Sequence, residues 1–178
     1  MPTSGLQSAK RNTSWNARHC GIPGGSKMHK MIAVEPPAGF VAYESLSPFT
    51  STFGTIYARF DAPATYRMGL YLSESHCNMA GSVHGGVVAT LCDITLARAT
   101  KGPTMQAQIF PTANLNVNYL STARLGEWME VRAVCSRLGT RMAFATAEVL
   151  AGDRLIATAT GVFSRPTGRL ASKAGSDA

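Results

Sequence analysis

The sequence predicts an α+β fold in which an antiparallel sheet packs around one long central helix. Residues 85–100 form an apolar run of helical length. Four predicted strands follow this helix, at residues 114–119, 128–137, 142–150 and 155–163. Short connections that contain glycine separate these strands, as is typical of the tight turns in antiparallel hairpins. One helix followed by a run of hairpins is typical of a sheet that covers a central helix.

The segments before the helix are less regular. Residues 1–34 are rich in Ser, Gly, Asn, Lys and Arg, and we expect a disordered basic extension there. The domain is predicted to span residues 35–165, with Pro36-Pro37 at its edge, and residues 166–178 are predicted to be a flexible tail. The apolar residues of segment 40–60 predict a short helix and a packed loop over the core.

The strand and the helix at the centre of the chain have clear apolar faces. Residues 66–75 are predicted to form a strand, with Met68, Leu70 and Leu72 on one face. The helix is predicted to end before Gly102-Pro103. Its bulky face consists of Val87, Val88, Leu91 and Ile94. The face around Asp93 is small except for one leucine, and it leaves room for a ligand or another backbone; it consists of Gly86, Ala89, Thr90, Leu96 and Ala97.

Composition excludes several classes of function. The chain has 178 residues, enough for one domain with a sizeable core. Its net charge of +7 divides into +5 for residues 1–34, +1 for 35–165 and +1 for 166–178. The domain itself is therefore nearly neutral, and we expect no nucleic-acid partner. We expect no membrane partner either, because no apolar run is long enough to span a bilayer. Four cysteines without a C-x-x-C pair, and no secretory signal, predict a cytoplasmic protein.

The stretch from Asn78 to Asp93 is the most informative part of the chain. The stretch begins with a polar loop that ends in His84-Gly85-Gly86. The apolar helix that carries Asp93 follows this loop. The Gly85 N–H at the helix start lacks an intrahelical partner and can hold an oxyanion, although two glycines also suit a simple tight turn. A carboxylate on an apolar helix is costly without a partner or a task. Asp93 is therefore a candidate general base or nucleophile; the alternative is a buried aspartate bonded to its neighbours.

Helix geometry separates these two groups. Eight residues at about 1.5 Å each place Asp93 roughly 12 Å along the axis from Gly85. One small carbonyl cannot easily contact both groups in one subunit. Two helices related by a two-fold axis would place Gly85 of one copy near Asp93 of the other. We therefore predict a homodimer with two shared sites.

Three polar residues complete the candidate site. Asn78 and His84, in the loop before the helix, can bind a carbonyl or a leaving group, or they can be a turn residue and a helix-entry contact. The hydroxyl of Thr112 can orient a water molecule, or Thr112 can be an ordinary strand residue.

We predict no metal, because the spacing of His76, Cys77, His84 and Cys92 matches no familiar zinc pattern. Cys92 is expected to pack in the core.

The pattern Asn78-x5-His84-Gly85-Gly86-x6-Asp93 closely resembles that of hotdog-fold acyl-CoA thioesterases of the phenylacetate-degradation type. The resemblance covers about residues 64–164 and includes the strand at 116–120. It implies subunits that join their sheets edge to edge, and dimers that often pair into tetramers. It also implies that Gly85 N–H polarises the thioester carbonyl and that Asp93 of the facing subunit activates water or attacks directly. Asn78 and His84 would then lie near the thioester, and Thr112 would help to place water.

The predicted function is hydrolysis of an acyl- or aryl-CoA thioester to the free acid and CoA. CoA belongs to the substrate, and we predict no separate cofactor. Gly86 is a predicted substrate-binding residue, as are Arg137 and Arg141, which can bind CoA phosphates or can simply be solvated hairpin residues. The main alternative is a non-catalytic acyl-CoA-binding protein with the same fold; a hydratase-like relative and a nucleic-acid-binding protein are less well supported. The acyl group and the choice of dimer or tetramer stay open.

Overall fold

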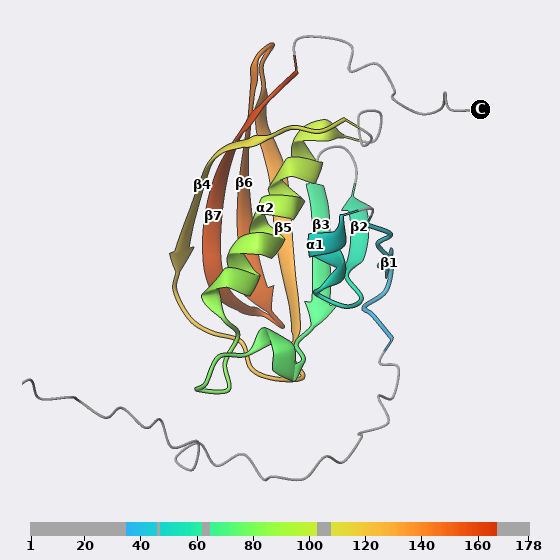
Figure 1. Cartoon of the computed structure of the whole chain (residues 1–178), viewed down its shortest axis with the longest axis vertical. Helices are drawn as coiled ribbons and strands as arrows, with labels where there is room; N and C mark the ends of the chain where they lie inside the picture. The colour runs from blue at the N-terminus through green and yellow to red at the C-terminus, as the bar shows by residue number, and fades with distance from the viewer. Residues whose placement is uncertain (1–34, 46, 62–64, 103–107, 167–178) are drawn as a thin grey trace, which may run out of the picture. The chain divides into compact units, whose positions relative to one another are not determined.

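The structure, a computed structural model, describes residues 35–45, 47–61, 65–102 and 108–166. In these ranges seven strands form one antiparallel sheet in the order β1-β2-β3-β5-β6-β7-β4. The long helix α2 lies across one face of that sheet (Figure 1). The predicted α+β fold with a central helix is therefore confirmed. The predicted extension, 1–34, lies outside the described residues, and so do residues 167–178 of the predicted tail.

The described residues form two α-helices, one 3-10 helix and seven strands. Their bounds are β1 Val41–Ala42, α1 Pro48–Ser51, β2 Tyr57–Asp61, β3 Thr65–Tyr71, a 3-10 helix Glu74–His76, α2 Gly85–Lys101, β4 Thr112–Tyr119, β5 Trp128–Leu138, β6 Met142–Ala151 and β7 Arg154–Ser164. No helix among the described residues has the length and apolar character needed to cross a bilayer.

The sequence prediction was wrong in two places before α2. The segment 40–60 contains the predicted short helix, α1, but also the strands β1 and β2, which the sequence did not indicate. Both strands are short, and the burial of β2 does not alternate cleanly. The predicted strand 66–75 ends at Tyr71, because the Ser73 hydroxyl and backbone N–H both contact the ring of His76 and start a 3-10 helix. His76 is the last residue of this 3-10 helix, and Cys77 follows it.

Small residues on the inner face of the sheet make room for α2. Ala143, Ala145 and Ala147 project from β6 toward the helix and are buried. A Cβ built on Gly161 of β7 would lie 3.2 Å from the Leu96 side chain, so this glycine also permits close approach of the helix. Buried side chains of α2 and of β3, β5 and β7 fill the remaining space, and this layer is the core of the domain.

The helix buries a slightly different face from the predicted one. Leu96 is 0% exposed and belongs to the core, whereas it was predicted to share the face of Asp93. Ile94, predicted on the buried face, is only half-buried and lines the same pocket as Asp93. Five strands, β3 to β7, contact α2, so the sheet also buries a residue at the border of the predicted ligand face.

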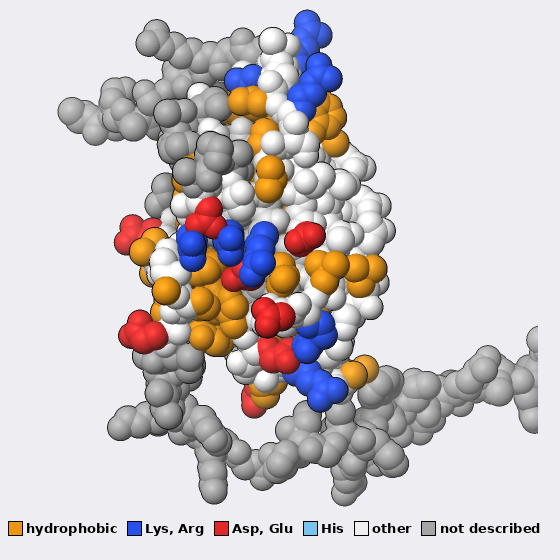
Figure 2. Space-filling model, turned by 180° about the vertical axis from the view of Figure 1, so that it is seen from behind, with side chains coloured by type: hydrophobic (Ala, Val, Ile, Leu, Met, Phe, Trp, Pro, Cys, Tyr) orange, Lys and Arg blue, Asp and Glu red, His pale blue; other side chains and the backbone are white. Residues whose placement is uncertain are grey.

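The outer face of the sheet carries a row of ion pairs. Figure 2 shows charged side chains gathered across the middle of this face. Arg59 pairs with Asp61 at 2.6 Å, and Arg132 pairs with Glu130. Arg67 lies between the two acids, with its Nε 2.7 Å from Asp61 and its Nη1 3.5 Å from Glu130. Although Arg67 Nε is this close to the Asp61 carboxylate, it does not point at it in hydrogen-bond geometry. These pairs connect β2, β3 and β5, while the candidate residues Gly85 and Asp93 lie on α2, on the opposite side of the sheet.

We expect Gly69→Ala to lower the free energy of unfolding by about 1–3 kcal/mol, as overpacking does elsewhere. A Cβ at Gly69 would lie 2.4 Å from the Trp128 ring and 2.9 Å from the Met129 carbonyl oxygen. Urea denaturation of Gly69→Ala, Trp128→Leu and the double variant measures this cost. The cost should fall in the Trp128→Leu background; an equal cost in both backgrounds would show that the indole is not the obstacle.

Candidate functional site

His84 caps the N-terminus of α2. Its backbone is extended, with φ −70° and ψ 135°, and its Nδ1 accepts a hydrogen bond of 2.9 Å from the Gly86 N–H. Because Nδ1 accepts, the neutral imidazole carries its proton on Nε2. The side chain is exposed, so this Nε2–H is a donor available to a ligand. The helix-entry contact proposed from the sequence is therefore present, and it leaves the other ring nitrogen for chemistry.

The Gly85 N–H is an available donor at the start of α2. Within the described residues it has no hydrogen-bond acceptor, as expected for the first residue of a helix. The Gly85 carbonyl accepts a hydrogen bond of 2.8 Å from the Tyr119 hydroxyl at the end of β4. Partial burial raises the pKa of Tyr119, so the phenol stays protonated and keeps donating. Tyr119, which the sequence analysis missed, thus attaches the helix start to β4.

Asn78 organises the loop before α2. Its Oδ1 accepts hydrogen bonds from the Ala80 N–H at 2.9 Å, the Ser82 N–H at 3.3 Å and the Ser82 hydroxyl at 3.2 Å. The turn role weighed for Asn78 is therefore real. These contacts use only the oxygen of the amide. In the described part of the chain its NH₂ group has no partner, so it too can donate to a ligand.

Asp93 and Thr112 form a hydrogen-bonded pair. The Thr112 hydroxyl, at the first residue of β4, donates to Asp93 Oδ1 at 2.7 Å. Asp93 is half-buried, while Thr112 is exposed. One carboxylate oxygen is thus held in place, and the other lone pairs of the carboxylate can accept a proton from water. The structure brings together these two residues, which are 19 positions apart in the chain.

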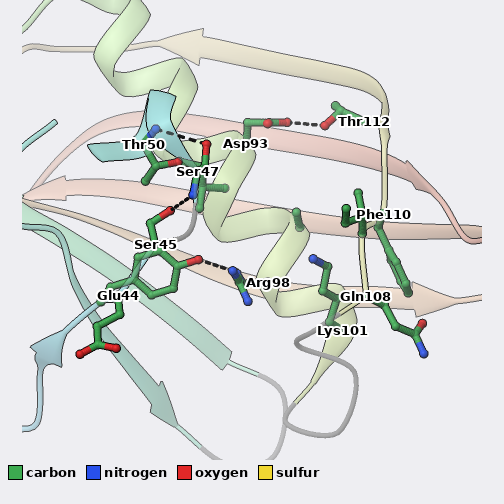
Figure 3. Close-up of a pocket in the computed structure, with 14 residues that line it drawn as sticks. Glu44, Ser45, Ser47, Thr50, Asp93, Arg98, Lys101, Gln108, Phe110 and Thr112 are labelled. Carbon is green, nitrogen blue, oxygen red and sulfur yellow. Dashed lines mark hydrogen bonds between the residues drawn. The ribbon is translucent and has the colours of Figure 1, made fainter. Parts of the chain in front are cut away.

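Asp93 lines a pocket of about 720 Å³ (Figure 3). One wall is the C-terminal half of α2, where Asp93, Ala97 and Lys101 recur at four-residue spacing. The other walls come from two further segments, with the lining residues Tyr43, Glu44, Ser45, Ser47, Thr50, Gln108, Ile109, Phe110 and Thr112. The charged end of this pocket, at Arg98 and Lys101, was not predicted from the sequence. The four-residue spacing from Asp93 was the signal that could have identified Lys101.

Several predicted residues lie outside this pocket. Gly85 lies about two turns of α2 away from Asp93 in the same chain. Gly86 is exposed, with its N–H bonded to His84. Arg137 and Arg141 flank the β5–β6 hairpin, and both are exposed and do not line the pocket. The candidate groups of one chain therefore lie in two separate places, one at the start of α2 and one in its middle.

Cys92, the neighbour of Asp93 in sequence, is buried in the core. Cys92 is 0% exposed, which confirms its predicted place in the core. Burial, together with a smaller contribution from the nearby Asp93 carboxylate, raises the pKa of its thiol to about 12. Among the described residues, Cys77, Cys92 and Cys135 are free thiols.

Comparison with known proteins identifies the family. The thioesterase superfamily matches residues 80–158. A Pseudomonas aeruginosa protein named as a putative esterase is 38% identical over 130 residues, which cover 73% of this chain and 97% of that protein. Human acyl-coenzyme A thioesterase 13 is 29% identical over 101 residues, covering 57% of this chain and 71% of the human protein.

A solved structure agrees with the sequence relatives. A point mutant of the phenylacetic acid degradation protein PaaI from Thermus thermophilus superimposes with a TM-score of 0.60 and 25% identity. The match covers 67% of this chain and 100% of that chain. The resemblance seen in the Asn78–Asp93 pattern is thereby confirmed: this chain belongs to the thioesterase superfamily and has its hotdog fold.

Proposed function

We propose that the protein is an acyl-CoA thioesterase, which hydrolyses an acyl- or aryl-CoA thioester to the free acid and CoA. The observation that carries this proposal is the Asp93 carboxylate, held by Thr112 and facing a pocket of about 720 Å³. A general base beside a pocket of this size suits an acyl group and an attacking water. Membership of the thioesterase superfamily supports the same reaction class.

The edge strand β4 explains how two copies can complete one site. In the described sheet β4 pairs only with β7, and its other edge is open. Thr112, bonded to Asp93, begins the strand, and Tyr119, bonded to Gly85, ends it. Antiparallel pairing of β4 with β4 of a second copy would place the Thr112 end of one strand beside the Tyr119 end of the other. Asp93 of one subunit would then face Gly85 of the other, and we propose this homodimer, with pairing of dimers into a tetramer.

In this dimer each group has a distinct chemical role. Asp93 takes a proton from water, and the hydroxyl oxygen adds to the thioester carbonyl carbon. The Gly85 N–H of the facing subunit stabilises the oxyanion that forms. Collapse of the intermediate breaks the C–S bond, and the leaving thiolate receives the proton from Asp93. Direct attack by Asp93, with later hydrolysis of the anhydride, uses the same positions.

Further groups fit the ends of the substrate. The donors at Asn78 Nδ2 and His84 Nε2 lie in the loop that leads to Gly85, where they can contact the thioester and its sulfur. The exposed Arg137 and Arg141 can bind phosphates of CoA at the surface.

The function is tested by incubating the full chain with a panel of aliphatic and aryl acyl-CoA thioesters and measuring release of the free thiol. Turnover of at least one class is expected. Tight binding of acyl-CoA without release of thiol would instead favour a non-catalytic acyl-CoA-binding protein.

Mixing two inactive variants is expected to restore activity. A heterodimer of Asp93→Asn and Gly85→Pro subunits contains one site with both groups intact and one with both lost, so it should recover about half of the wild-type activity. The heterodimer can be purified with two different tags and assayed beside both variant homodimers. A site built within one subunit would leave the heterodimer as inactive as its parents.

A further inference from the structure

The pocket beside Asp93 ends in two cations. Figure 3 shows Arg98 and Lys101 on the same part of α2, beyond the Asp93–Thr112 pair. Lys101 is only 8% exposed, and its amino group lies 5.7 Å from the centre of the Phe110 ring. Arg98 donates a hydrogen bond to the Tyr43 hydroxyl and lies over its ring. In the part of the chain that the structure describes, no carboxylate forms an ion pair with Lys101.

A buried ammonium group without a counter-ion is costly. Burial, with a smaller contribution from the nearby Arg98 charge, lowers the pKa of Lys101 to about 8. Both residues lie in the last turn of α2, where the helix dipole favours cations, but this typically contributes only about 0.3–1 kcal/mol. An anion inside the pocket would supply the missing partner.

The acids of the pocket do not take this role. Asp93 lies eight residues from Lys101, roughly 12 Å along the helix axis, and it is held by Thr112. Glu44 also lines the pocket, but it is exposed and, within the described residues, forms no ion pair with Lys101. The charges of the described pocket therefore divide into an acid end, where hydrolysis is proposed, and a basic end further along α2.

We propose that the preferred substrates are CoA thioesters whose acyl group ends in a carboxylate, which Lys101 binds together with Arg98. This inference rests on the proposed thioesterase function. Arg98 and Lys101 lie roughly 7.5 and 12 Å along the axis from Asp93, and helical side chains lean back toward the N-terminus. An extended acyl chain of about five to seven carbons is roughly 5–7.5 Å long, and a hydrogen bond of about 3 Å at each end brings its reach to that of the cations.

A phosphate of CoA is a poorer occupant of this end. Lys101 lies among Ala97, Ile94 and Phe110 in the pocket interior, and a doubly charged phosphate would lose most of its hydration there. A single carboxylate on an aliphatic chain matches both the apolar walls and the cationic end. The two occupants also predict different kinetics, because every substrate carries the CoA phosphates and only some carry an acyl carboxylate.

The test compares kcat/KM for hexanoyl-CoA with kcat/KM for the CoA monothioester of adipic acid, which has the same number of carbons. The wild-type chain should prefer the adipoyl thioester, and Lys101→Met should reduce that preference about 10- to 100-fold, as expected for loss of a charge-assisted hydrogen bond. Arg124→Met, which removes an exposed cation outside the pocket, is the matched control and should keep the wild-type ratio. Equal losses on both substrates would assign Lys101 to a CoA phosphate and overturn the proposal.

The pH profile gives a second readout. Lys101 binds an anion only when protonated, so the adipoyl-to-hexanoyl ratio should fall as pH rises through about 8 in the wild-type chain and stay flat in Lys101→Met. The other charged or titratable groups that line the pocket are Tyr43, Glu44, Asp93 and Arg98, and they are the same for both substrates. If the adipoyl-to-hexanoyl ratio fell in the same way in Lys101→Met, Lys101 would not be the group that binds the acyl carboxylate.

Failure of this inference is separable from failure of the proposed function. Lys101→Met removes a buried amine whose folded pKa is below that of the unfolded chain, so its charged form opposes folding and the variant should fold. A wild-type chain that hydrolyses hexanoyl-CoA at least as well as the adipoyl thioester would overturn the carboxylate preference alone. Hydrolysis of no thioester would reject the thioesterase itself.

Discussion

Asp93→Asn is expected to lower kcat for thioester hydrolysis at least about 100-fold, the usual contribution of a positioned general base. Asparagine has nearly the same shape, and its Oδ1 can still accept the hydrogen bond from Thr112 that holds Asp93 in the structure. The amide, however, can neither take a proton from water nor attack a carbonyl. The loss should therefore appear in kcat with little change in fold or subunit assembly.

The measurement is single-turnover and steady-state release of thiol from the best substrate of the panel. Asp153→Asn, in the exposed turn between β6 and β7, removes the same charge at a distance from the pocket and serves as the control. Unchanged hydrolysis in Asp93→Asn across the panel would reject Asp93 as base or nucleophile. A matching loss in Asp153→Asn would point to a general effect of charge instead.

Gly85→Pro is expected to lower kcat about 10²- to 10³-fold, the effect of removing one oxyanion-hole donor. Proline deletes the N–H that has no acceptor within the described residues, and proline is favoured at the first position of a helix. His84 before it has φ −70° and ψ 135°, a conformation that residues before proline prefer. The substitution thus removes a donor without demanding a new backbone path.

Gly85→Ala is the matched control for this variant. It adds a Cβ 3.4 Å from the Tyr119 ring, an ordinary contact, and it keeps the N–H. Thermal melting of both variants reports on the fold, and kcat reports on the donor. If Gly85→Ala lost as much activity as Gly85→Pro at equal stability, crowding beside Tyr119 would explain the effect and the N–H would have no special role.

Much of the fold was predictable because its signals are local. The α2 helix begins at Gly85 as predicted and ends at Lys101, one residue beyond the predicted end, because a histidine cap precedes it and Gly102, with φ +59°, closes it. The strands β5, β6 and β7 have bounds within one residue of the prediction, since turn residues and apolar segments define them directly. The short strands β1 and β2 were missed because pairing with a neighbour, and not their own sequence, makes them strands.

The candidate site divides in the same way. The motif from Asn78 to Asp93 placed the donors and the acid on one helix and its preceding loop, because helix geometry follows from spacing along the chain. The contact of Thr112 with Asp93 and that of Tyr119 with Gly85 bring β4 to both ends of this motif. Such contacts join residues 19 and 34 positions apart, and no local pattern specifies them.

The sequence by itself determined the family pattern, the long helix and the two groups proposed to act on a carbonyl, because capping, turn formation and apolar periodicity depend on neighbouring residues. Only the tertiary structure decided which side of α2 is open, that Lys101 is buried at the end of the pocket, and that β4 presents Asp93 and Gly85 at its opposite ends. These features depend on how a curved sheet wraps the helix, and sheet pairing between distant segments sets that curvature.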